Sequence, residues 1–127
     1  MVYATIGARD LAEALVFYDA VMATIGWRRH ADFPTSSAYS LDGSGEGFTL
    51  WVCRPFDGGT ASAGNGAMIG FPAPSQEAVE AFYTTALRLG GRDEGAPGLR
   101  LHYGPQVYVA YVRDLSGNKL SVVHSGG

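Results

Sequence analysis

The chain has 127 residues, 46 % of them hydrophobic and 17 % charged, a composition that is typical of one globular domain and excludes a disordered chain. Its formal net charge is −3 and no Lys/Arg cluster occurs, which excludes the usual pattern of a nucleic-acid-binding protein. The one cysteine, Cys53, excludes an intrachain disulfide and a Cys-rich zinc site, and we expect it to be an inert core residue. We expect no membrane span and no signal peptide, and predict a cytoplasmic location.

The first part of the sequence predicts a strand, a helix and three further strands. Small and β-branched residues over 2–8 predict the first strand, and Asp10 is a residue type that caps the start of a helix. Apolar residues recur at three- and four-residue spacing over 11–25, so this helix buries one stripe and ends at Gly26. The three following strands are predicted over 27–31, 37–41 and 48–53.

Residues 54–66 are polar, glycine-rich and aperiodic, which predicts a linker. A strand over 67–71 follows, and then a helix that Ser75 caps and Gly91 ends. The remaining strands are predicted over 92–94, 108–113 and 119–124.

The second part of the sequence repeats the first. Phe17-Tyr18 recurs 65 positions later as Phe82-Tyr83, and at the same offset the two helix caps and the two helix-ending glycines coincide. We therefore predict an α+β fold of two tandem β-α-β-β-β modules within one domain, with each helix covering one face of a curved mixed sheet around a pocket. The predicted boundaries are module 1 over 1–53, a linker over 54–66 and module 2 over 67–127.

Strand alternation predicts which side chains point away from the helices. In the first strand Tyr3, Thr5 and Gly7 should face away from the helix, and in the first strand of module 2 Met68 and Gly70 should do the same. Two sheets that are each covered on one face leave two open faces, and we expect a site where these faces meet.

Three segments, 6–27, 64–83 and 111–123, resemble the vicinal oxygen chelate superfamily, which includes glyoxalase I, bleomycin-resistance proteins and extradiol dioxygenases. The second segment resembles the family's G-N-G-x-H opening, and the third resembles its R-D-P-x-G-N-x-[IL]-E ending. The resemblance implies the paired-module fold and a homodimer. It also implies one divalent metal ion, held by His, Glu or Gln from the first and last strands of each module.

At the positions where the resemblance implies metal ligands, this chain has other residues. The His of the opening motif falls on Met68 and the first-strand ligand falls on Tyr3, 65 positions earlier, whereas the Glu of the ending falls on Ser121. Matching 117–122 with 47–52 makes Trp51 the fourth position. A thioether, a phenol, a hydroxyl and an indole are a poor ligand set for a divalent cation. We therefore predict neither a metal nor another cofactor.

These four residues have two interpretations: they fill the core, or they line a pocket that suits a small, partly aromatic organic molecule. Thr5 and Gly70 beside them would keep the pocket wall thin. Our leading hypothesis is a metal-independent glyoxalase/bleomycin-resistance-like protein that binds such a molecule. The alternative is a glyoxalase-type lyase or isomerase, or a dioxygenase-type enzyme, that uses a divalent metal or metal-free acid/base chemistry.

Further candidates lie near the predicted strand ends. Arg54 could pair with an anionic group of the ligand or form a plain turn interaction. Tyr108 and Tyr111 are three residues apart on one strand and point to opposite faces, so only one of them can line the pocket.

A long loop is predicted over 95–105. It contains His102 and Tyr103, which are weak candidates for acid/base catalysis, or else an ordinary surface pair. The turn into the last strand is expected to be built by Asp114, Gly117 and Asn118.

Overall fold

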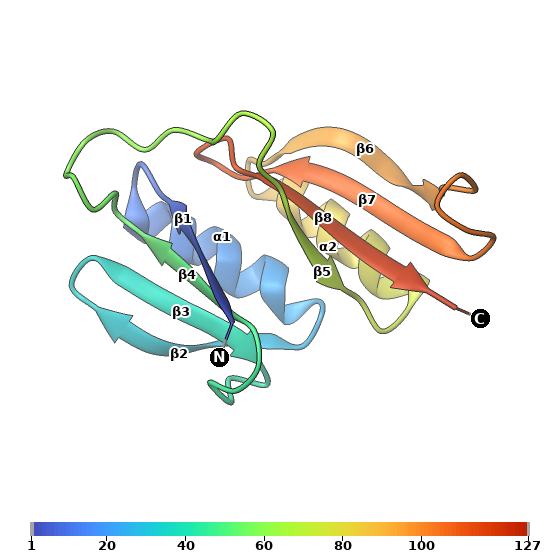
Figure 1. Ribbon diagram of the computed structural model, residues 1–127, viewed down its shortest axis with the longest axis horizontal. Coiled ribbons are helices and arrows are strands. Elements are labelled where there is room, and N and C mark those ends of the chain that lie inside the picture. The colour runs from blue at the N-terminus through green and yellow to red at the C-terminus, as the bar shows by residue number, and fades with distance from the viewer. Residues whose placement is uncertain (1, 127) are drawn as a thin grey trace.

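The computed structural model describes residues 2–126 and shows two modules of the same topology (Figure 1). This arrangement confirms the predicted α+β class and the tandem β-α-β-β-β repeat. The first module contains β1 (Tyr3–Gly7), α1 (Leu11–Ala23), β2 (Trp27–Phe33), β3 (Ser36–Leu41) and β4 (Thr49–Cys53). The second contains β5 (Ile69–Pro72), α2 (Gln76–Arg88), β6 (Arg92–Leu99), β7 (Val107–Arg113) and β8 (Lys119–Ser125).

Each module forms its own four-stranded mixed sheet. Sheet A has the order β1-β4-β3-β2 and sheet B the equivalent order β5-β8-β7-β6. The β1–β4 and β5–β8 pairs are parallel, and in them Thr5 lies opposite Trp51 and Gly70 lies opposite Ser121. The registers therefore confirm that Trp51 and Ser121 occupy equivalent places in the two modules, as the repeat predicted.

Two strands are longer than the sequence predicts. β2 continues to Phe33 and β6 continues to Leu99, whereas we expected these strands to end at Ala31 and Glu94. Both strands contain register irregularities, and such bulges let a ladder continue past residues that do not fit regular pairing. The glycines and the proline of 95–98 therefore belong to a strand, and the predicted loop over 95–105 is correct only for its second part.

The helices begin as predicted. The side chain of Asp10 accepts a hydrogen bond of 3.1 Å from the backbone N–H of Glu13, and Ser75 accepts one of 3.1 Å from that of Ala78. Each bond satisfies one of the free N–H groups in the first helical turn. After α1 the chain reverses at Gly26, whose φ of +83° suits glycine. No helix within residues 2–126 is long and apolar enough to cross a membrane.

The helix-facing side chains of both sheets form a single core. The helices α1 and α2 pack against each other, and the rings of Trp27 and Phe71, one from each sheet, meet edge-on with their centroids 5.3 Å apart. Buried polar groups also connect the modules: Tyr18 in α1 donates to Asp114 at 2.6 Å, and the Asn118 side chain donates to the carbonyl of Gly7 at 2.9 Å. Because these contacts lie on the helix side, both open faces are left free.

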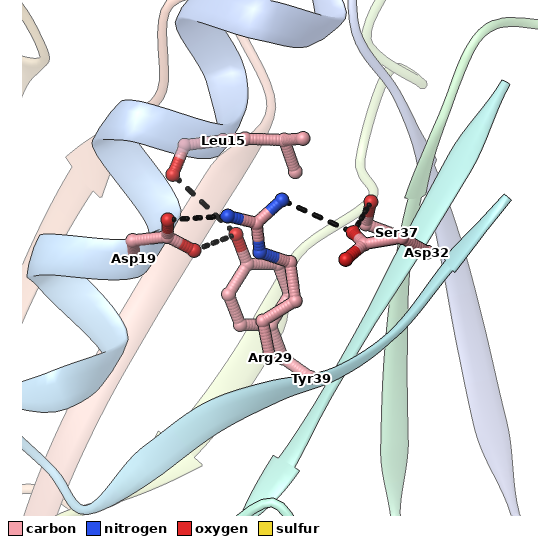
Figure 2. Close-up of polar contacts among 6 residues, drawn as sticks. All are labelled: Leu15, Asp19, Arg29, Asp32, Ser37 and Tyr39. Atoms are coloured by element: carbon pink, nitrogen blue, oxygen red, sulfur yellow. Dashed lines mark hydrogen bonds and ion pairs between the residues drawn. The ribbon is translucent and has the colours of Figure 1, made fainter. Parts of the chain in front are cut away.

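A network of hydrogen bonds and ion pairs connects α1 to the helix side of sheet A (Figure 2). Tyr39 donates a hydrogen bond of 2.6 Å to Asp19, and Arg29 forms ion pairs with Asp19 at 2.9 Å and with Asp32 at 3.0 Å. Ser37 donates to Asp32 at 2.6 Å, and this bond, together with Arg29, lowers the pKa of the Asp32 carboxyl. These polar groups satisfy one another, so the network has a structural role.

Candidate ligand-binding site

The open face of sheet A contains a hollow of about 360 Å³. Alternation along β1 brings Tyr3 and Thr5 to this face, and alternation along β4 brings Trp51 and Cys53 to it. Ser36 from β3 completes the lining, so the hollow is walled by sheet A alone. The structure thus brings together three of the predicted site residues, Tyr3, Thr5 and Trp51.

Aromatic side chains on this face remain accessible. Tyr3 is 61 % exposed, and Phe33 is 59 % exposed with its ring centroid 5.9 Å from that of Trp51. Phe33 lies beyond the predicted end of β2 at Ala31, although continued alternation from Ala31 places it on the same face. Cys53 is half-buried in the hollow and is not the core residue we expected, and burial raises the pKa of its thiol.

The open face of sheet B holds the other predicted residues in a different setting. Met68 lies just before β5 and not in the strand, which we predicted to begin at residue 67. Its side chain is 48 % exposed and lines a hollow of about 580 Å³ with linker residues, Arg113 and Lys119. Ser121 is buried, and a Cβ atom on Gly70 would lie 2.9 Å from its Oγ, so only glycine fits there without a shift. We expected Tyr3, Trp51, Met68 and Ser121 around one spot, whereas a single chain distributes them over two hollows and one buried position.

The structure decides between the two tyrosines of β7. Tyr108 packs on the helix side and donates a hydrogen bond of 2.7 Å to Glu80 of α2, so of the two candidates it is the one that does not face the pocket. Tyr111 lies opposite Ser121 on the open face. Burial, together with a hydrogen bond to Tyr103, raises the pKa of the Tyr111 phenol.

Cationic side chains surround Tyr111. Lys119 Nζ lies 5.4 Å from the centroid of the Tyr111 ring, and Arg100 Cζ lies 6.0 Å from it, both within the range of cation–π contacts. Arg113 forms an ion pair with Glu94, and its hydrogen bond lowers the pKa of that carboxyl. The sequence analysis did not identify Arg100 or Lys119, because their proximity depends on the register of β6, β7 and β8.

The remaining candidates lie at the margins of the two faces. His102 and Tyr103 are exposed, with ring centroids 4.1 Å apart. Arg54 is exposed and lines a hollow of about 1220 Å³ between the end of β1 and the linker. Among the ion pairs of residues 2–126, none joins Arg54 to Asp57, the acidic residue of the neighbouring turn.

The side chains at the expected ligand positions do not fit a divalent metal ion. The indole of Trp51 has no lone pair to donate, and the thioether of Met68 prefers soft ions. Tyr3 and Met68 also lie in separate hollows. In the described part of the chain, no group of three or more His, Cys, Asp or Glu side chains could hold a metal.

Comparisons with known proteins identify the fold and the family. No protein-family model and no curated protein matches the chain. A glyoxalase/bleomycin resistance protein from Albidiferax ferrireducens T118 superposes with a TM-score of 0.88 and 31 % identity, over 99 % of this chain and 98 % of that one. A glyoxalase-related enzyme from Fulvimarina pelagi gives a TM-score of 0.75 at 20 % identity, covering 98 % of this chain and 87 % of that one.

A lactoylglutathione lyase from Agrobacterium tumefaciens gives a TM-score of 0.66 at 19 % identity, covering 98 % of this chain and 92 % of that one. At such identities the last two comparisons show a shared fold only. The Albidiferax protein is similar in sequence as well, over nearly the whole of both chains. This chain therefore belongs to the glyoxalase/bleomycin resistance/dioxygenase superfamily, as its sequence motifs predicted.

Proposed function

We propose that this protein binds a small, partly aromatic organic molecule and does so without a bound metal ion. The observation that supports this most is the open face of sheet A, where Tyr3 and Trp51 line a hollow of about 360 Å³ and the exposed Phe33 ring lies 5.9 Å from that of Trp51. Ligand pockets of this size are typically apolar with a few polar groups, and aromatic rings give a flat ligand large contact areas. Thr5 and Ser36 supply hydroxyl groups at the wall.

The alternative that these residues fill the core fits the buried Ser121 but agrees poorly with the exposure of Tyr3 and Met68. Tyr3 is 61 % exposed and Met68 is 48 % exposed. On the open face of sheet A, Tyr3 lies with Phe33, which is 59 % exposed, and exposed apolar side chains that gather on one face mark binding surfaces more often than packing. A ligand, a second copy of the chain, or both would bury them.

We also propose that two copies of the chain complete the site. Within one chain the modules meet through α1, α2 and the polar contacts of Asp114, while the strand backbones of the two sheets stay apart. If sheet A of one copy covered sheet B of another, a two-fold axis would repeat the arrangement and bring Tyr3 and Met68 to one site twice. An interface of this kind buries on the order of 800 Å² on each partner.

Thermal denaturation in the presence of aromatic probes tests binding. The probes are benzoate, phenylacetate and 2-naphthoate, each paired with its uncharged amide, together with phenyl phosphate. A probe at 100 times its Kd should stabilise the protein by about 2.7 kcal/mol and raise its Tm. Trp51→Ala should remove this shift, whereas Arg88→Gln, on the exposed surface of α2, should keep it. If no probe raised the Tm of the wild-type protein, the proposal would be contradicted.

Metal analysis of the purified protein distinguishes the proposed function from the alternative, which is a lyase, an isomerase or a dioxygenase. One equivalent of Ni, Zn, Fe or Mn, with an activity that a chelator abolishes, would support a metal-dependent enzyme. Probe binding that is unchanged by a chelator supports the proposed metal-independent site.

A further inference from the structure

We propose that the ligand has an anionic group, a carboxylate or a phosphate, which binds on the open face of sheet B to Lys119 and Arg100, the two cations that contact the Tyr111 ring. This inference rests on the proposed function, because it assigns the chemical class of the ligand for the same site. Three observations support it: the first two concern sheet B alone, and the third compares the two open faces.

The first observation is a row of like charges across three strands. Arg92 lies opposite Arg113 in the β6–β7 pair, and Arg113 lies opposite Lys119 in the β7–β8 pair. Like charges that lie directly opposite one another destabilise a sheet. Glu94 pairs with Arg113 and offsets one of the three charges. In a chain of net charge −3, this row leaves a local excess of positive charge that an anion would neutralise.

The second observation is that two cations lie beside Tyr111 and that neither of them forms an ion pair with a carboxylate of residues 2–126. Arg100 donates a hydrogen bond of 2.9 Å to the carbonyl of Ala96, and both Arg100 and Lys119 are half-buried against the Tyr111 ring. Neither cation takes part in an ion pair among residues 2–126. A guanidinium can bind a carboxylate or phosphate with two parallel hydrogen bonds, and a lysine adds a point charge.

The third observation is the contrast between the two open faces. The hollow on sheet A is lined by no charged side chain, whereas the hollow on sheet B combines Met68 with Arg113 and Lys119. A ligand that contacts both faces therefore needs an aromatic part for Trp51 and an acidic part for Lys119. Aromatic carboxylic acids and aromatic phosphates have these two parts.

Binding measurements with the acid and amide pairs test the inference. We expect each acid to bind about tenfold more tightly than its amide, since a hydrogen bond to a charged group is stronger than one to a neutral group. Arg100→Gln and Lys119→Met should abolish this difference, whereas Arg88→Gln should preserve it. Added salt should weaken binding of the acid more than that of the amide. Phenyl phosphate compared with benzoate distinguishes a phosphate ligand from a carboxylate ligand.

A chemical comparison avoids substitutions that could disturb folding. Lys119 is the only lysine of the chain. Acetylation removes its charge and reductive methylation keeps it, while the N-terminal amine reacts in both treatments. Acetylated protein should lose the preference for acids, and methylated protein should retain it.

Two results would overturn the inference and leave the proposed function standing. One is equal binding of acids and amides by the wild-type protein. The other is an equal loss of acid and amide binding in Arg100→Gln and Lys119→Met, which would mean that these side chains act through packing. If no probe binds at all, the proposed function fails and the inference fails with it.

Discussion

The hydroxyl of Tyr18 in α1 donates a hydrogen bond of 2.6 Å to the carboxylate of Asp114, 96 positions further along the chain at the end of β7. Both side chains are buried. The other oxygen of Asp114 accepts from the backbone N–H groups of Ser116 and Asn118, which forms the turn that the sequence predicted. The same turn therefore shapes the last hairpin and fixes module 2 to α1, so it determines where the two open faces lie.

Tyr18→Phe should destabilise the protein by about 1–2 kcal/mol, because it removes a buried hydrogen bond to a charged acceptor. Tyr83→Phe is the matched control, since Tyr83 occupies the equivalent position of α2 but is half-exposed. Tyr83→Phe should lower the free energy of unfolding by about 0.5 kcal/mol or less. Urea unfolding monitored by circular dichroism measures both values, and equal costs for the two variants would contradict the role assigned to Tyr18.

The same tyrosine should make stability depend on alkaline pH. Burial, together with the charge of Asp114, raises the pKa of Tyr18 well above its ordinary value of 10.0. An unfolded tyrosine loses its proton near pH 10, whereas Tyr18 stays protonated in the folded state. Above about pH 10 the unfolded state therefore binds fewer protons, and stability falls as pH rises. Urea unfolding at about pH 9 and about pH 11 measures how much unfolding free energy is lost as the pH rises. This loss should be smaller for Tyr18→Phe than for the wild type. An equal loss in both proteins would refute the proposed role of Tyr18 in the pH dependence.

The network of Figure 2 should be coupled energetically but unrelated to ligand binding. In a double-mutant cycle, Tyr39→Phe and Asp19→Asn should show a coupling of about 1 kcal/mol, since their hydrogen bond of 2.6 Å is partly buried. Arg29→Met should cost less, because ion pairs near the surface contribute little. All three variants should keep wild-type affinity for the aromatic probes, because the network lies on the opposite face of sheet A from Trp51. A loss of affinity would mean that the site has been assigned to the wrong face.

The two tryptophans should have separate roles. Trp51→Ala should weaken probe binding by about tenfold or more, which is the loss expected when an aromatic contact is removed, and should change stability by only about 1 kcal/mol. Trp27 is buried against Phe71, so Trp27→Ala should cost about 3–5 kcal/mol in unfolding free energy. Fluorescence titration and urea unfolding of the two variants measure both effects. Unchanged probe binding in Trp51→Ala would remove the main support for the proposed site.

Much of the fold was predictable because it depends on local chemistry. The helix caps at Asp10 and Ser75, the helix-ending glycine at position 26 and the alternation of β1 and β4 all follow from nearest neighbours in the sequence. The extension of β6 was not predictable, because glycine and proline over 95–98 are typical of a loop, and pairing with β7 overrides that preference.

The candidate site was predictable only in part. Alternation predicts which side of its own strand Tyr3 or Gly70 occupies, but it contains no information on how two separate sheets are placed. The row of Arg92, Arg113 and Lys119 likewise depends on strand register, which the bulges in β6 alter. Long-range packing determines both features.

The most direct test of the account uses two unique reactive groups. Cys53 on the open face of sheet A and Lys119 on that of sheet B are the only cysteine and the only lysine of the chain. A short maleimide–succinimidyl ester reagent can join the two groups where the faces meet. Peptide mapping of a mixture of light and heavy isotope-labelled protein then shows whether a cross-link joins two copies of the chain. We predict covalent dimers in which Cys53 of one copy is joined to Lys119 of the other, and an aromatic acid should suppress the reaction. If single-ended reagents label both groups but no such cross-link forms, a site shared between the two open faces is contradicted.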